Sequence, residues 1–178
     1  MRVMITGHRP ARLGGYDPAN PKKLALIEKF KLILDRAAEA AKGEALVAIS
    51  GMALGCDQWW ATAAIERGID VHAYIPFEGQ EGKWPRVSQR AYYELLNGAA
   101  EVWISCAPGY AAWKMQERNC DMVDNADYCV AVWDRSPSGT GRCVGYAIEK
   151  GRPLLVVNPD TLDDRWEDSA FPSSLEVW

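Results

Sequence analysis

Three short segments of the sequence combine glycines with side chains that bind anions or move protons. The first, Thr6-Gly7-His8-Arg9-Pro10, follows an apolar run and sets a histidine beside an arginine. Histidine titrates near neutral pH, and arginine binds phosphate or carboxylate through two parallel hydrogen bonds. Taken alone, the segment fits a surface turn fixed by its proline. Together with the other two segments, it predicts ligand-binding residues at Thr6, Gly7, His8 and Arg9.

The second segment, Ser50-Gly51-Met52-Ala53-Leu54-Gly55, joins an apolar run to an amphipathic one. Glycines at such a junction let backbone N–H groups approach a ligand, and a helix N-terminus favours a bound phosphate. A tight strand–helix turn without a ligand explains the same glycines equally well. Helix capping is the simpler interpretation of Asp57, and hydrogen bonding to a ribose is the alternative. The predicted binding residues here are Ser50, Gly51, Met52, Gly55 and Asp57.

The third segment, Ser136-Pro137-Ser138-Gly139-Thr140-Gly141, repeats this pattern after Asp134. Small hydroxyl residues and glycines ahead of a helix form a second phosphate cradle. Such clusters are also common in plain loops, so the prediction depends on the two cradles sharing one sheet edge. The predicted binding residues are Asp134, Ser138, Gly139 and Thr140.

Two cations, Lys114 and Arg118, lie one turn apart at the start of a predicted helix. Cations there oppose the helix dipole, so an anionic ligand nearby would stabilise them; Asp121 is the internal alternative. We include both cations in the predicted site. Trp84 and Trp113 each stand beside a lysine, where a base could stack on the ring or the ring could simply close a loop.

The elements that position these segments follow from apolar runs that alternate with longer amphipathic stretches. This alternation is typical of a parallel sheet covered by helices. The predicted strands are residues 3–5, 46–49, 70–75, 101–104, 128–133 and 153–157. The predicted helices are residues 26–41, 56–68, 88–96, 114–125 and 143–150. The expected fold is α/β, a Rossmann-like three-layer sandwich with a mostly parallel central sheet, in which ligands bind beyond the carboxyl ends of the strands.

Length and composition fit a single globular unit. The chain has 178 residues, of which 48% are hydrophobic and 25% charged, so it can close a core as one domain. We expect residues 1–159 to form the nucleotide-binding domain and residues 160–178 to form an acidic, aperiodic tail. The net charge of -4 disfavours sequence-blind binding to duplex DNA, although a local basic pocket is compatible with it.

Cysteine and histidine usage bears on metal binding and on the compartment. The five cysteines form no CxxC pair, and the chain has only two histidines, so we predict neither a metal site nor a cofactor. Free thiols suit a reducing compartment, and the N-terminus begins directly with a strand pattern. No apolar run is long enough to span a bilayer. The expected location is therefore cytoplasmic, away from the membrane.

Four motifs together resemble the SLOG superfamily, and within it the YpsA-like branch. They are Thr6–Pro10, Ser50–Asp57, Ile75-Pro76-Phe77-Glu78-Gly79-Gln80 and the segment from Trp133 to Thr140. The resemblance covers residues 1 to about 159. It implies a Rossmann-like domain that binds nucleotides, nucleotide-derived signals or nucleic acid, and it brings Pro76 and Glu78 into the predicted site.

The leading functional hypothesis is binding or sensing of a nucleotide-type small molecule, with its phosphate on the two cradles and Arg9 as a clamp. An alternative is a nucleotide N-glycosidic hydrolase that uses His8 or a carboxylate. The related phosphoribohydrolases carry a glutamate on the helix after the glycine-rich turn. In this sequence the first acidic residue after that turn is Glu149, so the acid would come from Asp57, Glu78 or Glu81.

A third hypothesis is single-stranded nucleic-acid binding, as in DNA-processing protein A of the same superfamily, and the acidic balance makes it the less favoured one. The expected groove would combine aromatic rings with cations: Trp84, Trp113, Arg9, Lys83, Arg86, Arg90, Lys114 and Arg118. The aromatic excess, with Trp59 and Trp60, also suggests a homodimer.

Overall fold

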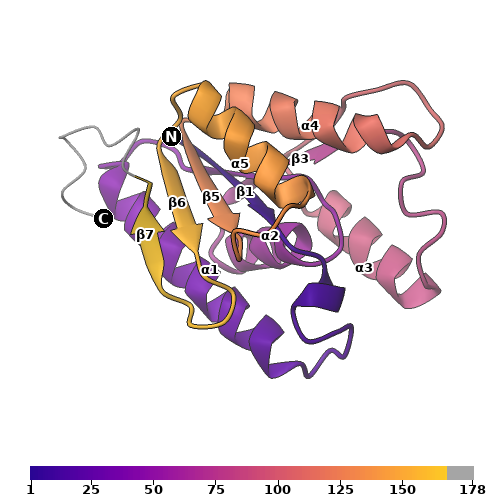
Figure 1. Ribbon diagram of the computed structural model, residues 1–178, viewed down its shortest axis with the longest axis horizontal. Helices are drawn as coiled ribbons and strands as arrows, with labels where there is room; N and C mark the ends of the chain where they lie inside the picture. Colours follow the sequence, from indigo (N-terminus) through magenta and orange to yellow (C-terminus); the bar gives the residue numbers. More distant parts are fainter. Residues whose placement is uncertain (168–178) are drawn as a thin grey trace.

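The structure of the chain is a computed structural model that describes residues 1–167. Its centre is a seven-stranded sheet in the order β4-β3-β2-β1-β5-β6-β7 (Figure 1). The strands are β1 (Arg2–Gly7), β2 (Val47–Ser50), β3 (Asp70–Ile75), β4 (Glu101–Ile104), β5 (Tyr128–Val132), β6 (Leu154–Val157) and β7 (Asp164–Trp166). Six strands are parallel, and β7 alone runs antiparallel to its neighbour β6.

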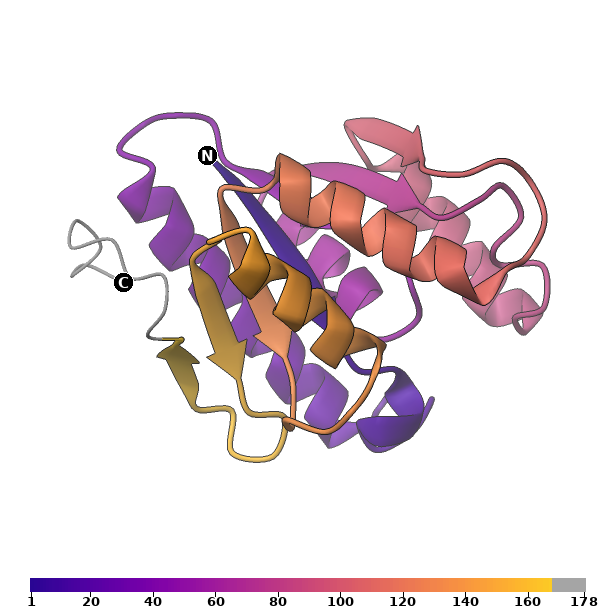
Figure 2. The same ribbon diagram turned by 45° about the horizontal axis from the view of Figure 1, so that its top comes forward.

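Helices cover both faces of the sheet, which gives three layers (Figures 1 and 2). One face carries α1 (Pro21–Ala40), α2 (Cys56–Glu66) and α3 (Arg86–Asn97). The other face carries α4 (Ala112–Asn125) and α5 (Gly139–Glu149), and a short 3-10 turn, η1 (Pro10–Arg12), follows β1. The predicted α/β, Rossmann-like sandwich is therefore confirmed. Within residues 1–167, no helix is both long and apolar enough to cross a membrane.

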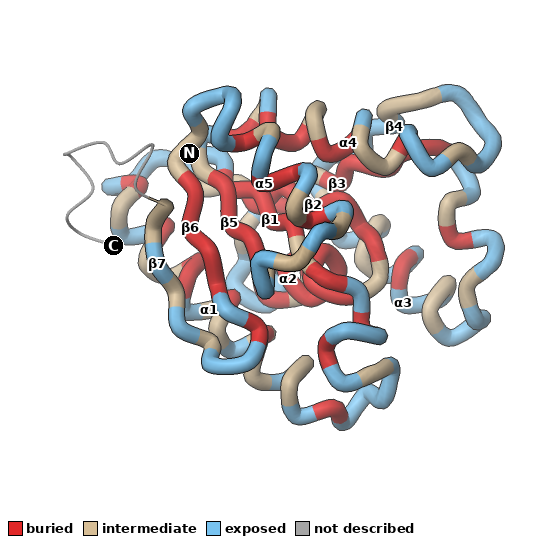
Figure 3. The backbone as a smooth tube through the Cα atoms, viewed as in Figure 1, coloured by how far each residue is buried: buried red, intermediate tan, exposed pale blue. Residues whose placement is uncertain are grey.

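The apolar residues form one core on each face of the sheet. Because β1, β5 and β6 are covered on both sides, they are almost continuously buried (Figure 3). On the α1–α2 face, Phe30 packs edge-on against Trp60 with ring centroids 5.6 Å apart. On the α4–α5 face, Met122 and Val144 pack with strand residues. Burying each large side chain contributes about 1.5–3 kcal/mol, so the two cores fix the strand ends that carry the site.

Trp59 and Trp60, on which the expectation of a homodimer partly rested, belong to the interior. Trp60 is fully buried, and Trp59 is only 8% exposed. Both pack in the core on the α1–α2 face, so neither offers a surface to a second copy. A homodimer therefore stays a prediction, without support from this pair.

The largest differences from the sequence-based boundaries lie at three places. Helix α1 begins at Pro21 rather than at residue 26, because the Asn20 side chain accepts a hydrogen bond from the N–H of Lys22 and caps the helix there. Helix α5 begins at Gly139 rather than at Cys143, because the Ser138 hydroxyl accepts a hydrogen bond from the N–H of Gly141 and caps the helix there. The segment after Asn158, expected to be aperiodic, contains β7, whose Asp164 forms ion pairs with Lys29 and Arg36 of α1. The sheet thus continues past residue 159, and the rest of the predicted tail, 168–178, lies outside the described residues.

The strand order reverses direction between β1 and β5. From β1 the chain builds β2, β3 and β4 outward on one side, and then returns to place β5 against the other side of β1. The loops after β1 and β5 therefore leave the sheet edge in opposite directions and open a crevice between them. In open parallel sheets this switch point is where ligands bind.

Candidate functional site

A cavity of about 230 Å³ lies at this switch point, and we call it the switch-point cavity. Its walls come from the loop after β1, the β2–α2 loop, α4 and the start of α5. The lining residues are Thr6, Gly7, His8, Arg9, Arg12, Ala53, Asp57, Met115, Arg118, Asn119, Ser138, Gly139 and Thr140. Nine of the seventeen residues predicted from the sequence are among them.

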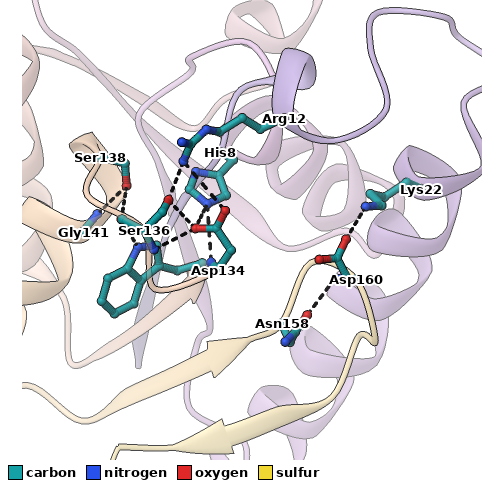
Figure 4. Close-up of polar contacts among 10 residues, drawn as sticks. His8, Arg12, Lys22, Asp134, Ser136, Ser138, Gly141, Asn158 and Asp160 are labelled. Carbon is teal, nitrogen blue, oxygen red and sulfur yellow. Dashed lines mark hydrogen bonds and ion pairs between the residues drawn. The ribbon is translucent and has the colours of Figure 1, made fainter.

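His8 and Asp134 connect the two strand ends across the switch point. His8 is buried, and its Nε2 lies 2.9 Å from Oδ1 of Asp134 (Figure 4). Because this short contact joins the ring to a carboxylate, we assign the proton to Nε2, which leaves Nδ1 as the nitrogen available for other chemistry. Gly7 permits this arrangement, since a Cβ there would lie 2.5 Å from the Cys56 side chain and push β1 away from α2.

Asp134 is held as a carboxylate by its neighbours. The backbone N–H and the hydroxyl of Ser136 both donate to Asp134 Oδ1, and Arg12 Nη1 lies 3.8 Å from Oδ2 (Figure 4). Hydrogen bonds from Ser136, followed by the bond from His8, lower the pKa of Asp134 well below its usual range. The charged Asp134 therefore orients the imidazole of His8 at neutral pH.

The loop between β2 and α2, the first predicted cradle, is organised around a carboxylate of the protein itself. The N–H of Ala53 donates to Oδ2 of Asp57 at 3.3 Å, and the N–H of Met52 donates to the Ser50 hydroxyl at 3.1 Å. Gly55 adopts a left-handed φ of 102°, and a Cβ there would lie 2.6 Å from the His8 carbonyl oxygen. The Asp57 carboxylate therefore occupies part of the space in which the sequence predicts a bound phosphate.

A buried ion pair joins this loop to α4. Arg118 Nη1 lies 3.2 Å from Asp57 Oδ2 and also donates to the Gly51 carbonyl oxygen. Burial raises the pKa of Asp57 against the opposing effect of Arg118 and Arg9. Burial also lowers the pKa of Arg118, although a guanidinium stays protonated in proteins. Nε of Arg118 is buried and has no hydrogen-bond partner within residues 1–167, so it is an unused donor beside the cavity.

The second predicted cradle is open. The Ser138 hydroxyl oxygen accepts a hydrogen bond from the Gly141 N–H at 3.0 Å. The N–H groups of Gly139 and Thr140 donate to no atom in the described part of the chain. A Cβ built at Gly139 would meet no atom within 4 Å, so this helix end faces open space. Two free N–H donors at the positive end of α5 suit an anion.

The structure also brings in residues that the sequence did not single out. Asn119 is buried on α4, lines the cavity, and its amide makes no hydrogen bond within residues 1–167. Arg12, Ala53 and Met115 complete the lining. Arg12 is the last residue of η1, just after the first segment, and Asn119 directly follows Arg118; neither position carries a motif. Only the packing of η1 and α4 reveals them.

Other predicted residues lie elsewhere. Lys114 is buried with its Nζ donating to the carbonyl oxygens of Ala107, Pro108 and Gly109 at 2.7, 3.2 and 2.7 Å. It therefore holds the β4–α4 loop and does not line the cavity. Glu78 lines a second cavity, described below, and Pro76 ends β3 without lining either one. Ser50, Gly51, Met52 and Gly55 shape the loop behind Asp57 and Arg118.

Known proteins show the same fold and sequence pattern. The family YpsA, described as the YspA SLOG family, matches residues 3–153. An SPbeta prophage-derived protein of Bacillus subtilis, YoqJ, is 31% identical in an alignment 163 positions long that covers 79% of this chain and 92% of that protein. A UPF0398 protein of Oceanobacillus iheyensis is 25% identical in an alignment 177 positions long that covers 93% of this chain and 93% of that protein.

Two solved structures of DNA processing protein A share the fold. The protein from Streptococcus pneumoniae superposes with a TM-score of 0.65 at 21% identity, covering 91% of this chain and 52% of that one. The protein from Helicobacter pylori, solved for its single-stranded DNA binding mode, gives a TM-score of 0.62 at 19% identity, covering 89% and 65%. These likenesses concern the fold, whereas the family match spans most of the sequence. The chain belongs to the YspA SLOG family, as its four motifs predicted.

Proposed function

We propose that this protein binds a nucleotide-type small molecule whose phosphate group occupies the switch-point cavity. The observation that carries the proposal is a set of unused donors on one cavity: the N–H groups of Gly139 and Thr140, Nε of Arg118 and the amide of Asn119. Among these donors, Nε of Arg118 is buried, so leaving it without a partner costs free energy. A bound anion would satisfy it together with the neighbouring donors.

The charges around the cavity favour an anion. Three arginines line it, Arg9, Arg12 and Arg118, against the single carboxylate of Asp57. Arg118 forms an ion pair with Asp57, and the Arg12 guanidinium lies within ion-pair distance of Asp134. The Arg9 side chain is exposed and forms no hydrogen bond or ion pair within residues 1–167, so its guanidinium remains for the ligand. This supports the clamp predicted from the sequence, with the phosphate on the α5 cradle rather than on the β2–α2 loop.

The test is a thermal-shift and calorimetric screen against nucleoside mono-, di- and triphosphates with the wild-type protein, Arg9→Ala and Arg90→Ala. Arg90 is an exposed arginine on α3, paired with Glu94 and outside the cavity, so it is the matched control. A ligand at about a hundred times its Kd adds roughly 2.7 kcal/mol, which raises Tm by about 5–10 °C. We expect Arg9→Ala to abolish the shift and Arg90→Ala to keep it. No shift with any nucleotide, or equal shifts in both variants, would refute the proposal.

The pairing of His8 with Asp134 favours a second candidate, hydrolysis of an N-glycosidic bond. A buried histidine oriented by a carboxylate is the arrangement of a general base that would activate water to attack the anomeric carbon. Of the three acids considered for protonating the leaving base, only Asp57 lines the switch-point cavity, and its ion pair with Arg118 holds it as a carboxylate; Glu81 is bonded to the Tyr93 hydroxyl. His8 would therefore take a proton from the attacking water, and the leaving base would take one from solvent water. Release of free base by the wild type but not by His8→Asn would establish this activity, and intact nucleotide after prolonged incubation would exclude it.

The nucleic-acid hypothesis loses two of its predicted contacts. Lys114 and Arg118 were expected to face the phosphates of a single strand, but both are buried and bound to protein oxygen atoms. The fold likeness to DNA processing protein A does not restore these contacts. We therefore place the small-molecule ligand first.

A further inference from the structure

A second cavity of about 350 Å³ adjoins the switch-point cavity at the same edge of the sheet, and we call it the aromatic cavity. It is formed by the loops after β3 and β4 together with the loop after β1. Its lining residues are Arg9, Phe77, Glu78, Gly79, Gln80, Lys83, Trp84, Gly109, Tyr110 and Met115. Arg9 and Met115 line both cavities, so the two spaces share a wall.

The two cavities differ in chemistry. The switch-point cavity is lined by arginines, small polar residues and backbone N–H groups, and no aromatic ring lines it other than the imidazole of His8. The aromatic cavity presents Phe77, Trp84 and Tyr110. At about 230 Å³, the first is smaller than the roughly 300–1,000 Å³ of a typical small-molecule site. A phosphate-bearing ligand therefore extends beyond it, and the shared wall directs that extension toward the rings.

We propose that the aromatic cavity binds the base of the ligand, so that the protein selects nucleoside phosphates over phosphosugars without a base. This inference rests on the proposed function, because the phosphate fixes the end of the ligand in the switch-point cavity. The flat π-faces of nucleobases stack on aromatic side chains, and a neighbouring cation adds to the attraction.

Tyr110 is the ring best placed for stacking. It is 70% exposed, so its face is available. Phe77 holds it edge-on with centroids 6.1 Å apart, and Lys83 Nζ lies 5.9 Å from its centroid. Lys114, bound to the carbonyls of the β4–α4 loop, fixes the backbone just before Tyr110. The ring is therefore positioned by its surroundings, with Lys83 over one face, and its exposure leaves ring surface for a base.

Polar groups at the same cavity supply contacts for the edge of a base. Gln80 donates its Nε2 to the Tyr92 hydroxyl at 3.2 Å, which leaves its Oε1 as an acceptor, and Glu78 is exposed without a partner within residues 1–167. Glu78 and Gln80 thus offer acceptors to an exocyclic amine. This gives the third family-like motif, Ile75 to Gln80, a role that the switch-point cavity does not use.

The test compares the four nucleoside 5′-monophosphates with ribose 5-phosphate by calorimetry on wild type, Tyr110→Leu and Tyr16→Leu. Leucine removes the ring at an exposed position, so folding is preserved; Tyr16 is 62% exposed and lines neither cavity, so it is the matched control. We expect at least one monophosphate to bind wild type at least tenfold more tightly than ribose 5-phosphate. Tyr110→Leu should weaken that nucleotide about five- to hundredfold, as expected for one lost stack, and leave ribose 5-phosphate within twofold.

The outcomes separate the two proposals. If ribose 5-phosphate binds as tightly as every monophosphate, or if Tyr110→Leu weakens both ligands equally, the base does not occupy the aromatic cavity although the phosphate site stands. If neither ligand binds wild type and no nucleoside di- or triphosphate shifts its Tm, the proposed function fails and this inference fails with it. Arg9→Ala should weaken both ligands by similar factors, because Arg9 belongs to the wall that the cavities share.

Discussion

Gly51→Ala gives the sharpest test of how the β2–α2 loop is built. A Cβ at this position would lie 1.5 Å from Nη1 of Arg118 and 2.7 Å from Oδ2 of Asp57. The guanidinium must retreat by about 2 Å to reach the roughly 3.5 Å of ordinary contact. That movement breaks both its 3.2 Å ion pair with Asp57 and its hydrogen bond to the Gly51 carbonyl.

The expected loss of stability follows from the burial of this pair. Separating a buried ion pair while both charges stay inside costs about 3–5 kcal/mol, because each charge is left without its partner. For a chain of this size the loss lowers Tm by roughly 6–20 °C. Gly145→Ala is the control, since a Cβ on that helical glycine meets nothing within 4 Å. Alanine there should raise stability by about 0.5–1 kcal/mol through helix propensity.

Urea unfolding of the two variants and the wild type, with calorimetric Tm values, measures both effects. Equal m-values would show that the variants unfold from a similarly compact state, so that the midpoints report stability. A Gly51→Ala protein that melts within about 2 °C of wild type would refute the argument. It would mean that the loop moves freely, and the space around Gly51 would then be available to a ligand as the sequence suggested.

Four further predictions follow from the site. Asn119→Ala should leave stability unchanged or raised but weaken nucleotide binding, because the buried amide has no protein partner; loss of stability in urea unfolding would contradict this. Lys114→Ala should lower stability by roughly 1–3 kcal/mol through its three carbonyl bonds yet keep the affinity for ribose 5-phosphate; calorimetry showing a lost anion site would overturn the structural role. The folded-state pKa of Asp134 lies below the usual 3.8, so the ionised carboxylate stabilises the folded protein fully above about pH 3.8, and this stabilisation is lost as pH falls through the folded-state pKa. The urea-midpoint difference between wild type and Asp134→Asn should therefore be constant from pH 7 to 5 and narrow below about pH 4. Iodoacetamide should modify Cys106 and Cys120, which are partly exposed, before Cys56, Cys129 or Cys143, which are buried, because burial raises the pKa of all five thiols and only the first two can be reached in the native protein; mass spectrometry of the peptides decides this.

The six parallel strands and five α-helices could be predicted because their patterns are local. β7 could not, because a strand of only three residues, Asp164–Trp166, carries too little periodicity. Its place is set by the ion pairs of Asp164 with Lys29 and Arg36, which come from a helix more than a hundred residues earlier. The start of α5 was missed for a different reason: glycines lower helix propensity, and the cap at Ser138 outweighs them.

The candidate site could be predicted in part, because ligands bind beyond the carboxyl ends of parallel strands and those ends could be located in the sequence. The parallel order placed Thr6 to Arg9 beside Ser138 to Thr140, as the motifs implied. The pairing of side chains could not be predicted. The sequence does not show that Arg118 forms an ion pair with Asp57, so it predicts both as ligand contacts. Lys114 shows the same limit. A cation near a helix N-terminus predicts an anion, but here three carbonyl oxygens satisfy it instead.

The contact of His8 with Asp134 also bears on how the molecule folds. The two residues are 126 positions apart, and β1 pairs both with β2 and with the much later β5. Closing so long a loop is entropically costly, so the β1–β5 pairing should form after the local strand–helix units. The switch-point cavity then exists only in the last, fully assembled state. Recovery of nucleotide binding during refolding should therefore lag behind recovery of helical circular dichroism, and ligand should speed no step before the two halves of the sheet meet.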